Sequence, residues 1–218
     1  MIWTQIRGTL ALSASICTAL QFLAGVLVCR KYIKNGSTGD SSALAFITCF
    51  MSCSLWMIYG CYIKDIFVIC VNLFGIILQA IYIVIFALYC LKRWTTLKQV
   101  TAALIFTTLV YLYANFIQTD KALATKHIGF LSCSLTILFF ASPLTLLAHV
   151  IRVKSTESLP FPVIMASMIV SCQWFAYGCL INDQFIQIPN FMGCVLSGFQ
   201  LSLFLIYPSK RPEQTYFI

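Results

Sequence analysis

Charged residues are scarce in this chain. Asp, Glu, Lys and Arg make up 9% of its 218 residues, whereas hydrophobic residues make up 61%. A soluble domain carries roughly a quarter charged residues, because its surface has to be hydrated. The composition therefore excludes an ordinary soluble domain and indicates that lipid surrounds most of the chain. The net charge of +8 does not indicate a nucleic-acid partner, because the basic residues lie in short loops between apolar segments.

Groups that carry out chemistry are also missing. The eleven cysteines are scattered singly, and no pair has the Cys-x-x-Cys spacing of a zinc or redox site. Within an apolar helix a free cysteine behaves as a small hydrophobic residue. No set of nucleophile, base and metal ligands is clustered in the sequence. We therefore expect no metal site, no cofactor and no enzymatic activity.

Long uncharged segments are what the chain does contain. Each is near the ~20 residues that cross a bilayer as a helix, and together they predict an all-α membrane protein with seven transmembrane helices. The predicted spans are Thr9 to Cys29, Ala43 to Tyr62, Ile66 to Cys90, Val100 to Ile117, Ile128 to Ile151, Phe161 to Ile181 and Phe185 to Tyr207.

The basic residues predict the orientation in the membrane. With the N-terminus outside, the inner side holds ten basic residues and the outer side four, which agrees with the excess of Lys and Arg in cytoplasmic loops. The inner set is Arg30, Lys31, Lys34, Lys92, Arg93, Lys98, Arg152, Lys154, Lys210 and Arg211. The outer set is Arg7, Lys64, Lys121 and Lys126. We therefore expect an external N-terminus and a cytosolic C-terminus.

The strongest signal is an internal repeat. When the sequence is shifted by 118 residues, nine of the twenty positions from Trp56 to Gly75 are identical, where chance gives roughly one or two. The identical pairs include Trp56 with Trp174, Tyr59 with Tyr177, Asp65 with Asp183, Asn72 with Asn190 and Gly75 with Gly193. The repeat predicts a three-helix unit at 9–90, a linker helix at 98–118 and a second three-helix unit at 127–208.

The shift also predicts how the two units are oriented. It moves the first span to the fifth, four crossings later, and an even number of crossings restores the original direction. The prediction is a 3+1+3 arrangement of two parallel three-helix bundles, with the fourth helix as an inverting linker and a central site where the bundles meet.

Two symmetric pairs of residues are the candidates for this site. The amides of Asn72 and Asn190 lie deep in the third and seventh spans, where a buried amide without partners costs ~1–3 kcal/mol. They either tie helices together or bind the hydroxyl groups of a solute, and their equivalence under the repeat favours the second role. Trp56 and Trp174 form the second pair: a tryptophan in a span usually packs against other helices or anchors the interface, but its aromatic face can also stack on the apolar C–H face of a pyranose ring. No span contains Asp, Glu, Lys or Arg, which favours uncoupled passage of a neutral polar solute over coupled transport.

These motifs resemble the SWEET (saliva) family of sugar transporters over nearly the whole chain. The motifs that carry the resemblance are Ser37-Thr38 and Ser155-Thr156, the two Trp-x-x-Tyr-Gly and the two Asn-x-x-Gly segments, and Ala141-Ser142-Pro143. The short C-terminal tail is closer to the animal branch. The resemblance implies facilitative, bidirectional transport of mono- or disaccharides by alternating access, with the four paired residues around the sugar and Gln21 and Phe139 in the pocket.

Hinge prolines are the point at which the sequence departs from this family. The resemblance implies four, in the first, second, fifth and sixth spans. Pro143 and Pro160 fit the last two, whereas Gly25 and Ala45 stand at the positions matched to the first two. Proline removes a helical hydrogen bond and permits a kink, so the first unit is expected to bend less or by another device.

Two alternatives remain open from the sequence. A carrier of the related Pro-Gln-loop architecture moves another small polar solute, but no Pro-Gln dipeptide occurs here. A seven-helix receptor also has an external N-terminus, but it has no parallel repeat. The expected partners are a sugar, most simply a glucose-like monosaccharide, and the lipid bilayer, with no nucleic acid. A homo-oligomer is compatible with the sequence. The expected location is the plasma membrane, with the Golgi or another endomembrane as the alternative.

Overall fold

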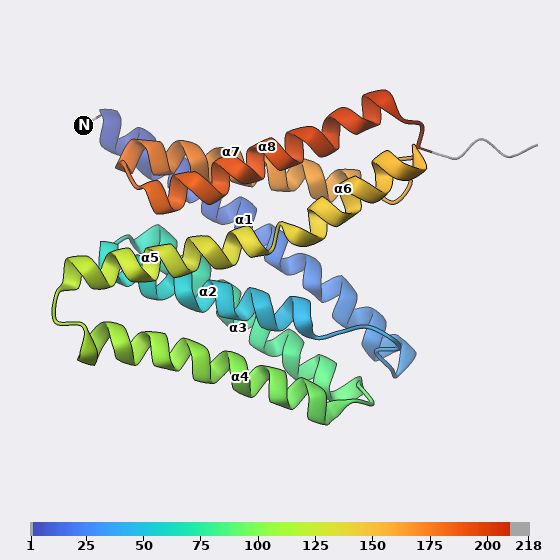
Figure 1. Ribbon diagram of the computed structural model, residues 1–218, viewed down its shortest axis with the longest axis horizontal. Coiled ribbons are helices and arrows are strands. Elements are labelled where there is room, and N and C mark those ends of the chain that lie inside the picture. Colours follow the sequence, from blue (N-terminus) through green and yellow to red (C-terminus); the bar gives the residue numbers. More distant parts are fainter. Residues whose placement is uncertain (1, 210–218) are drawn as a thin grey trace, which may run out of the picture. The chain divides into compact units, whose positions relative to one another are not determined.

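The computed structural model describes residues 2–209, and within that range all regular secondary structure is helical (Figure 1). The helices are α1 (Ile2–Asn35), α2 (Leu44–Ile63), α3 (Ile66–Tyr89), α4 (Arg93–Leu112) with the π-helical turn η1 (Tyr113–Ile117), α5 (Lys121–Leu138), α6 (Ala141–Val153), α7 (Phe161–Ile181) and α8 (Gln184–Ile206). Lys210 and Arg211, which the sequence analysis assigned to the inner side, lie outside the described residues.

Seven helical segments of the described chain are long and apolar enough to cross a membrane, which confirms the predicted number of spans. The fourth joins α4 to η1, at Arg93–Ile117, and the fifth joins α5 to α6, at Lys121–Val153. The predicted bounds of the other spans agree closely, except for α1, which extends beyond the predicted Thr9–Cys29 at both ends. Apolar composition marks the part of a helix that lipid can bury, whereas this helix continues through its basic last turns until Gly36, whose φ is +63°.

The chain forms two compact units, Met1–Ser134 and Leu135–Ile218. In the first unit α3 packs against both α1 and α2, and α2 also packs against α4. In the second unit α8 packs against α7 and, less extensively, against α6. Large hydrophobic side chains remain exposed along the spans, among them Leu27, Val84 and Leu109. Apolar surface of this extent indicates that lipid covers it.

The fifth span is interrupted between α5 and α6 (Figure 1). Phe139 and Phe140 form a tight turn in which the amide of Phe140 donates to the carbonyl of Ile137 at 3.0 Å. Pro143 lies four residues after Phe139 and has no N–H, so it cannot donate to the Phe139 carbonyl as a helical residue at that position does. The break therefore lies one turn before Pro143, where a proline is expected to open a helix.

The first span has no such break. Gly25, at the position that the 118-residue shift pairs with Pro143, lies inside the continuous helix α1. A methyl group added at Gly25 is placed against the ring of Tyr82 in α3, 2.7 Å from Cδ2 and 2.9 Å from Cζ. The small residue is therefore required here by the close approach of α1 and α3.

The other two predicted hinge positions lie at helix starts. Ala45 is the second residue of α2, and Pro160 immediately precedes α7 as its N-cap. Under the 118-residue shift Ala45 pairs with Val163 and Pro160 pairs with Ser42, so these two positions are not equivalent.

Candidate functional site

The two predicted amides have the same local geometry in the two units. Nδ2 of Asn72 donates to the carbonyl of Val68 at 2.8 Å, and Nδ2 of Asn190 donates to the carbonyl of Ile186 at 2.8 Å. Both side chains are half-buried. This is the one hydrogen bond that each amide makes within residues 2–209, so its Oδ1 and its second N–H stay available. Each asparagine can therefore accept and donate one further bond.

A glycine one turn after each asparagine lets the neighbouring helices approach closely. Methyl groups added at Gly75 in α3 or Gly193 in α8 meet side chains of neighbouring segments. The nearest atoms belong to Cys53 and Phe22, both at 2.7 Å from Gly75, and to Ser171 at 2.6 Å and Phe140 at 3.7 Å from Gly193. The 118-residue shift relates Cys53 to Ser171 and Phe22 to Phe140, so the contacts repeat as well as the identities.

The two predicted indoles also repeat their surroundings. The ring centroids of Trp56 and Tyr59 lie 5.6 Å apart at an interplanar angle of 86°, and those of Trp174 and Tyr177 lie 5.7 Å apart at 82°. Edge-to-face pairs of this kind fix the orientation of the rings. Tyr59 and Tyr177 are buried, whereas Trp56 is half-buried and Trp174 is 9% exposed. Each tyrosine therefore holds the neighbouring indole in place.

A tight turn joins the helix that carries each tryptophan to the helix that carries the following asparagine, and it fixes the positions of the two residues relative to each other. Between α2 and α3 the chain turns at Lys64, whose φ is +56°, and between α7 and α8 it turns at Asn182, whose φ is +55°. Asp65 and Asp183 then cap the following helices, each accepting from two backbone N–H groups. These caps satisfy donors that a helix start leaves without partners. The accepting bonds are those from Phe67 and Val68 to Asp65 and from Phe185 and Ile186 to Asp183.

The remaining predicted pocket residues occupy different local settings. Gln21 is half-buried within α1, and Phe139 lies in the break between α5 and α6. Asn72, Trp56 and Gln21 belong to the first unit. Asn190, Trp174 and Phe139 belong to the second unit.

Sequence reasoning missed three residues of this region. Phe22 and Phe140 contact the glycines beside the two asparagines, and their identity under the 118-residue shift was a usable signal. Gln79 lies seven residues after Asn72, two helical turns along α3, and is only 5% exposed. Its Oε1 accepts no hydrogen bond within the described chain. Gln79 does not belong to an identical pair of the repeat, because its counterpart under the 118-residue shift is Ser197.

Comparison with known proteins places this geometry in a family. A family model described as a sugar efflux transporter for intercellular exchange matches the chain twice, at residues 8–94 and 126–212. The double match supports the internal repeat. The family consists of transporters, and the chain is accordingly not an enzyme but a multi-pass membrane protein.

The alignments with individual relatives span most of the length of both chains. The sugar transporter SWEET1 of Drosophila pseudoobscura pseudoobscura is 44% identical over 92% of this chain and 89% of its own. The human sugar transporter SWEET1 is 31% identical, over 90% and 89% of the two chains. The bidirectional sugar transporter N3 of Medicago truncatula is 30% identical, over 91% and 75%.

A solved structure agrees with these relatives. The structure of a eukaryotic SWEET transporter superposes with a TM-score of 0.88 at 27% identity and covers 94% of this chain and 98% of its own. The family resemblance predicted from the paired motifs is thereby confirmed, including its animal branch. The chain belongs to the SWEET family of sugar transporters.

Proposed function

We propose that this protein carries sugar across its membrane by facilitated diffusion in both directions. The observation that carries the proposal is the repetition of one uncharged amide and one indole, in the same local geometry, in each half of the chain. Relatives named as sugar transporters and as a bidirectional sugar transporter support it.

The chemistry of the four residues suits a neutral sugar. Each of Asn72 and Asn190 retains an acceptor and a donor, which matches a sugar hydroxyl, itself both donor and acceptor. The faces of Trp56 and Trp174 suit the apolar C–H face of a pyranose ring. Binding of millimolar order, ~4 kcal/mol, fits a carrier, because the solute also has to leave. We propose a glucose-like monosaccharide as the substrate, with Gln21 and Phe139 as further pocket residues.

Two ionisable groups near the outer helix ends, Asp65 and His127, are engaged in structural bonds, which supports uncoupled transport. Asp65 is 6% exposed, but it caps α3 and lies 3.8 Å from the guanidinium of Arg7. His127 Nδ1 lies 2.6 Å from the hydroxyl of Tyr113, at the junction of η1 and α5. A proton-coupled carrier keeps a carboxylate in mid-membrane for the proton, and these groups hold helix ends instead.

We further propose alternating access, in which the two three-helix repeats predicted at 9–90 and 127–208 move about the linker helix of 98–118. The break before Pro143 is the point at which the second repeat bends. The excess of basic residues on one side supports an external N-terminus, and the plasma membrane is the proposed location.

Uptake of labelled glucose, fructose and sucrose in cells without their own sugar carriers tests the function. We expect saturable uptake that equilibrates with the external sugar and does not respond to proton or sodium gradients. Accumulation of sugar against its own gradient would contradict the uncoupled mechanism. If none of these sugars enters although the protein is present at the surface, sugar transport itself is refuted, in favour of another small polar solute.

Asn72→Ala and Asn190→Ala test the site. Each removes one of the proposed hydrogen-bonding amides, and we expect flux to be abolished at unchanged surface expression. Asn115→Ala is the matched control, because Asn115 donates to the carbonyl of Tyr111 at 2.9 Å in the same four-residue pattern, but on an exposed face of the unrepeated linker. Normal flux in both site variants removes the proposed site, and an equal loss in the control shows that the effect is not specific to the site.

A further inference from the structure

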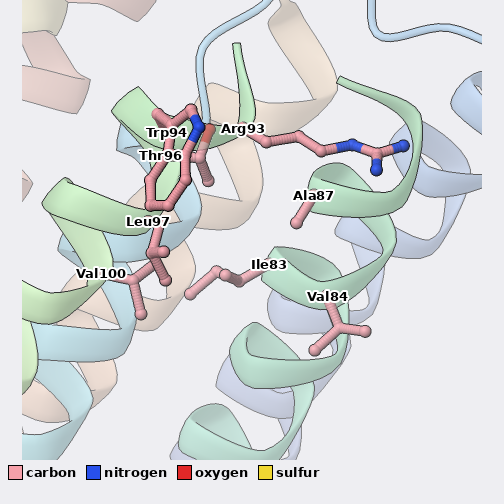
Figure 2. Close-up of a pocket in the computed structure, with 8 residues that line it drawn as sticks. All are labelled: Ile83, Val84, Ala87, Arg93, Trp94, Thr96, Leu97 and Val100. Atoms are coloured by element: carbon pink, nitrogen blue, oxygen red, sulfur yellow. The ribbon is translucent and has the colours of Figure 1, made fainter. Parts of the chain in front are cut away.

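An apolar groove lies between the end of α3 and the start of α4, away from the residues proposed to bind sugar (Figure 2). Ile83, Val84 and Ala87 line it from α3, and Trp94, Leu97 and Val100 line it from α4, around a volume of about 460 Å³. This volume is in the range of small-molecule sites, ~300–1,000 Å³. The groove lies wholly within the first unit.

The walls of the groove are unsuited to a sugar. Apart from Arg93 at its end, the polar groups of the lining are the indole N–H of Trp94 and the hydroxyl of Thr96, which is 5% exposed. That hydroxyl lies 3.5 Å from the carbonyl of Lys92 and 3.7 Å from Sγ of Cys90. With its one hydroxyl already engaged, the lining favours a hydrocarbon chain over a polar solute.

The end of the groove carries positive charge. Arg93 extends from α4 past Ala87 (Figure 2), and its Nη2 donates to the carbonyl of Leu88 at 3.2 Å. Most of the five guanidinium N–H donors stay available for an anion. The α1–α2 and α3–α4 connections meet at this end of the unit, where the amide of Thr38 donates to the carbonyl of Tyr89 at 3.3 Å. This end bears six basic side chains and one acidic one, namely Arg30, Lys31, Lys34, Lys92, Arg93 and Lys98 against Asp40.

We propose that this groove binds an anionic phospholipid, with an acyl chain along the apolar walls and the phosphate at Arg93. A basic cluster next to an apolar groove between transmembrane helices matches such a molecule in both its parts. Trp94 is 76% exposed beside the cluster, where tryptophan is favoured at the level of the lipid headgroups. The positive-inside rule assigns this end to the cytosolic leaflet, in which anionic lipids are concentrated.

A second copy of the chain is a poorer occupant of the same groove. A symmetric contact through this face brings two identical basic clusters together, and like charges repel when they are desolvated. An anionic lipid neutralises the cluster instead. The proposal does not depend on the transported solute, because it concerns only lipid binding to the first unit.

Quenching of Trp94 fluorescence by brominated lipids tests the proposal. The protein is reconstituted in phosphatidylcholine vesicles that contain increasing fractions of brominated phosphatidylserine or, in parallel, brominated phosphatidylcholine. Trp94→Phe supplies the background from the other three tryptophans. We expect phosphatidylserine to bind beside Trp94 several-fold more strongly than phosphatidylcholine, since each nearby basic residue contributes about fivefold.

Two variants locate the two parts of the lipid, and a third is the control. Arg93→Gln is expected to lower the preference for phosphatidylserine about fivefold. Ala87→Phe fills the groove and is expected to reduce quenching by both lipids. Lys126→Gln, an exposed basic residue of α5, is the control and is expected to change nothing. Circular dichroism and gel filtration confirm that each variant is folded.

Three results overturn the proposal. Equal quenching by the two lipids in the unmodified chain shows that the groove does not select an anionic headgroup. An unchanged preference in Arg93→Gln shows that the guanidinium does not bind the phosphate. Absence of quenching of Trp94 by either lipid shows that the groove is covered by protein, as in contact with a second copy.

Discussion

Gly25→Ala distinguishes a packing role of Gly25 from a hinge role. Gly25 stands where its repeat counterpart is Pro143, and the resemblance to the sugar-transporter family implies a hinge at this position. In the structure it lies inside continuous helix α1, against the ring of Tyr82. A packing glycine predicts a loss of stability on substitution, whereas a hinge glycine predicts slower transport at unchanged stability.

The surroundings of Tyr82 set the magnitude. The ring is 2% exposed, its centroid lies 5.5 Å from that of Phe46, and its hydroxyl donates to the carbonyl of Phe22 at 3.1 Å. The ring is therefore held on several sides and cannot move aside easily for an added methyl group. Overpacking of this kind costs ~1–3 kcal/mol, offset by a gain in helix propensity of up to ~1 kcal/mol. Because the added methyl group lies within 3.0 Å of three ring atoms, the cost is expected in the upper part of this range, ~2–3 kcal/mol, and the net loss for Gly25→Ala is about 1–2 kcal/mol.

Thermal unfolding of the purified protein in detergent measures this loss. At ~2–4 °C per kcal/mol for a chain of this length, Gly25→Ala is expected to lower Tm by about 2–8 °C. Gly8→Ala is the matched control, because Gly8 lies on the same helix with no atom within 4 Å of an added methyl group. Its Tm is expected to stay the same or to rise.

A second background makes the test specific to the ring. In Tyr82→Leu the space that the ring filled is partly open, so Gly25→Ala is expected to cost nothing there. If Gly25→Ala lowers Tm equally in both backgrounds, the contact with Tyr82 is not the cause. If it leaves Tm unchanged and slows sugar exchange, the packing argument is refuted and Gly25 acts as a hinge.

Two further predictions concern helix ends and the break in the fifth span. Asp65→Ala and Asp183→Ala each remove a cap that accepts from two backbone N–H groups, so thermal unfolding is expected about 2–4 °C lower for a loss of ~1 kcal/mol, with Asn variants retaining most of the stability. Unchanged Tm in the Ala variants contradicts the capping role. Pro143→Ala restores an N–H that can donate to the carbonyl of Phe139. Amide hydrogen exchange across the α5–α6 break is then expected to slow, and so is the transport of sugar. Rapid hydrogen exchange retained at the break shows that Pro143 does not cause it.

Apolar composition predicted the number and approximate bounds of the spans because the bilayer fixes the length of an apolar helix. In the structure, the correspondence under the 118-residue shift extends beyond identical residues. It relates Lys64 to Asn182, which differ in chemistry but share a left-handed turn conformation before an aspartate cap. Residues of different type can therefore fill equivalent backbone positions, and the repeat holds at the level of geometry.

Contacts between helices are the part that the sequence did not predict. The role of Gly25 depends on Tyr82, 57 residues later in the chain, and no local pattern reveals that approach. Pro143 was predicted from the sequence as a hinge, but the break itself was not placed, although the N–H that proline lacks is the helical donor to the carbonyl one turn earlier, at Phe139. Phe22 and Phe140 were missed because they pack against glycines, which carry no side chain to suggest a partner.

Each repeat consists of a first span and a helical hairpin, and the two repeats agree more closely in the hairpin than in the first span. The hairpins α2–α3 and α7–α8 share the same asparagine hydrogen bond, the same Trp–Tyr pair and the same turn followed by an aspartate cap. The first span of each repeat does not, because α1 is continuous whereas α5 and α6 are separated by a break. If the hairpins bind the solute and bending occurs in the first span of a repeat, each repeat contributes an equivalent half of the binding site. Only the second repeat then bends at mid-span. We therefore expect the two halves of the site to contribute equally to sugar binding, and substitutions at the α5–α6 break to change the rate of exchange more than substitutions at the equivalent place in α1.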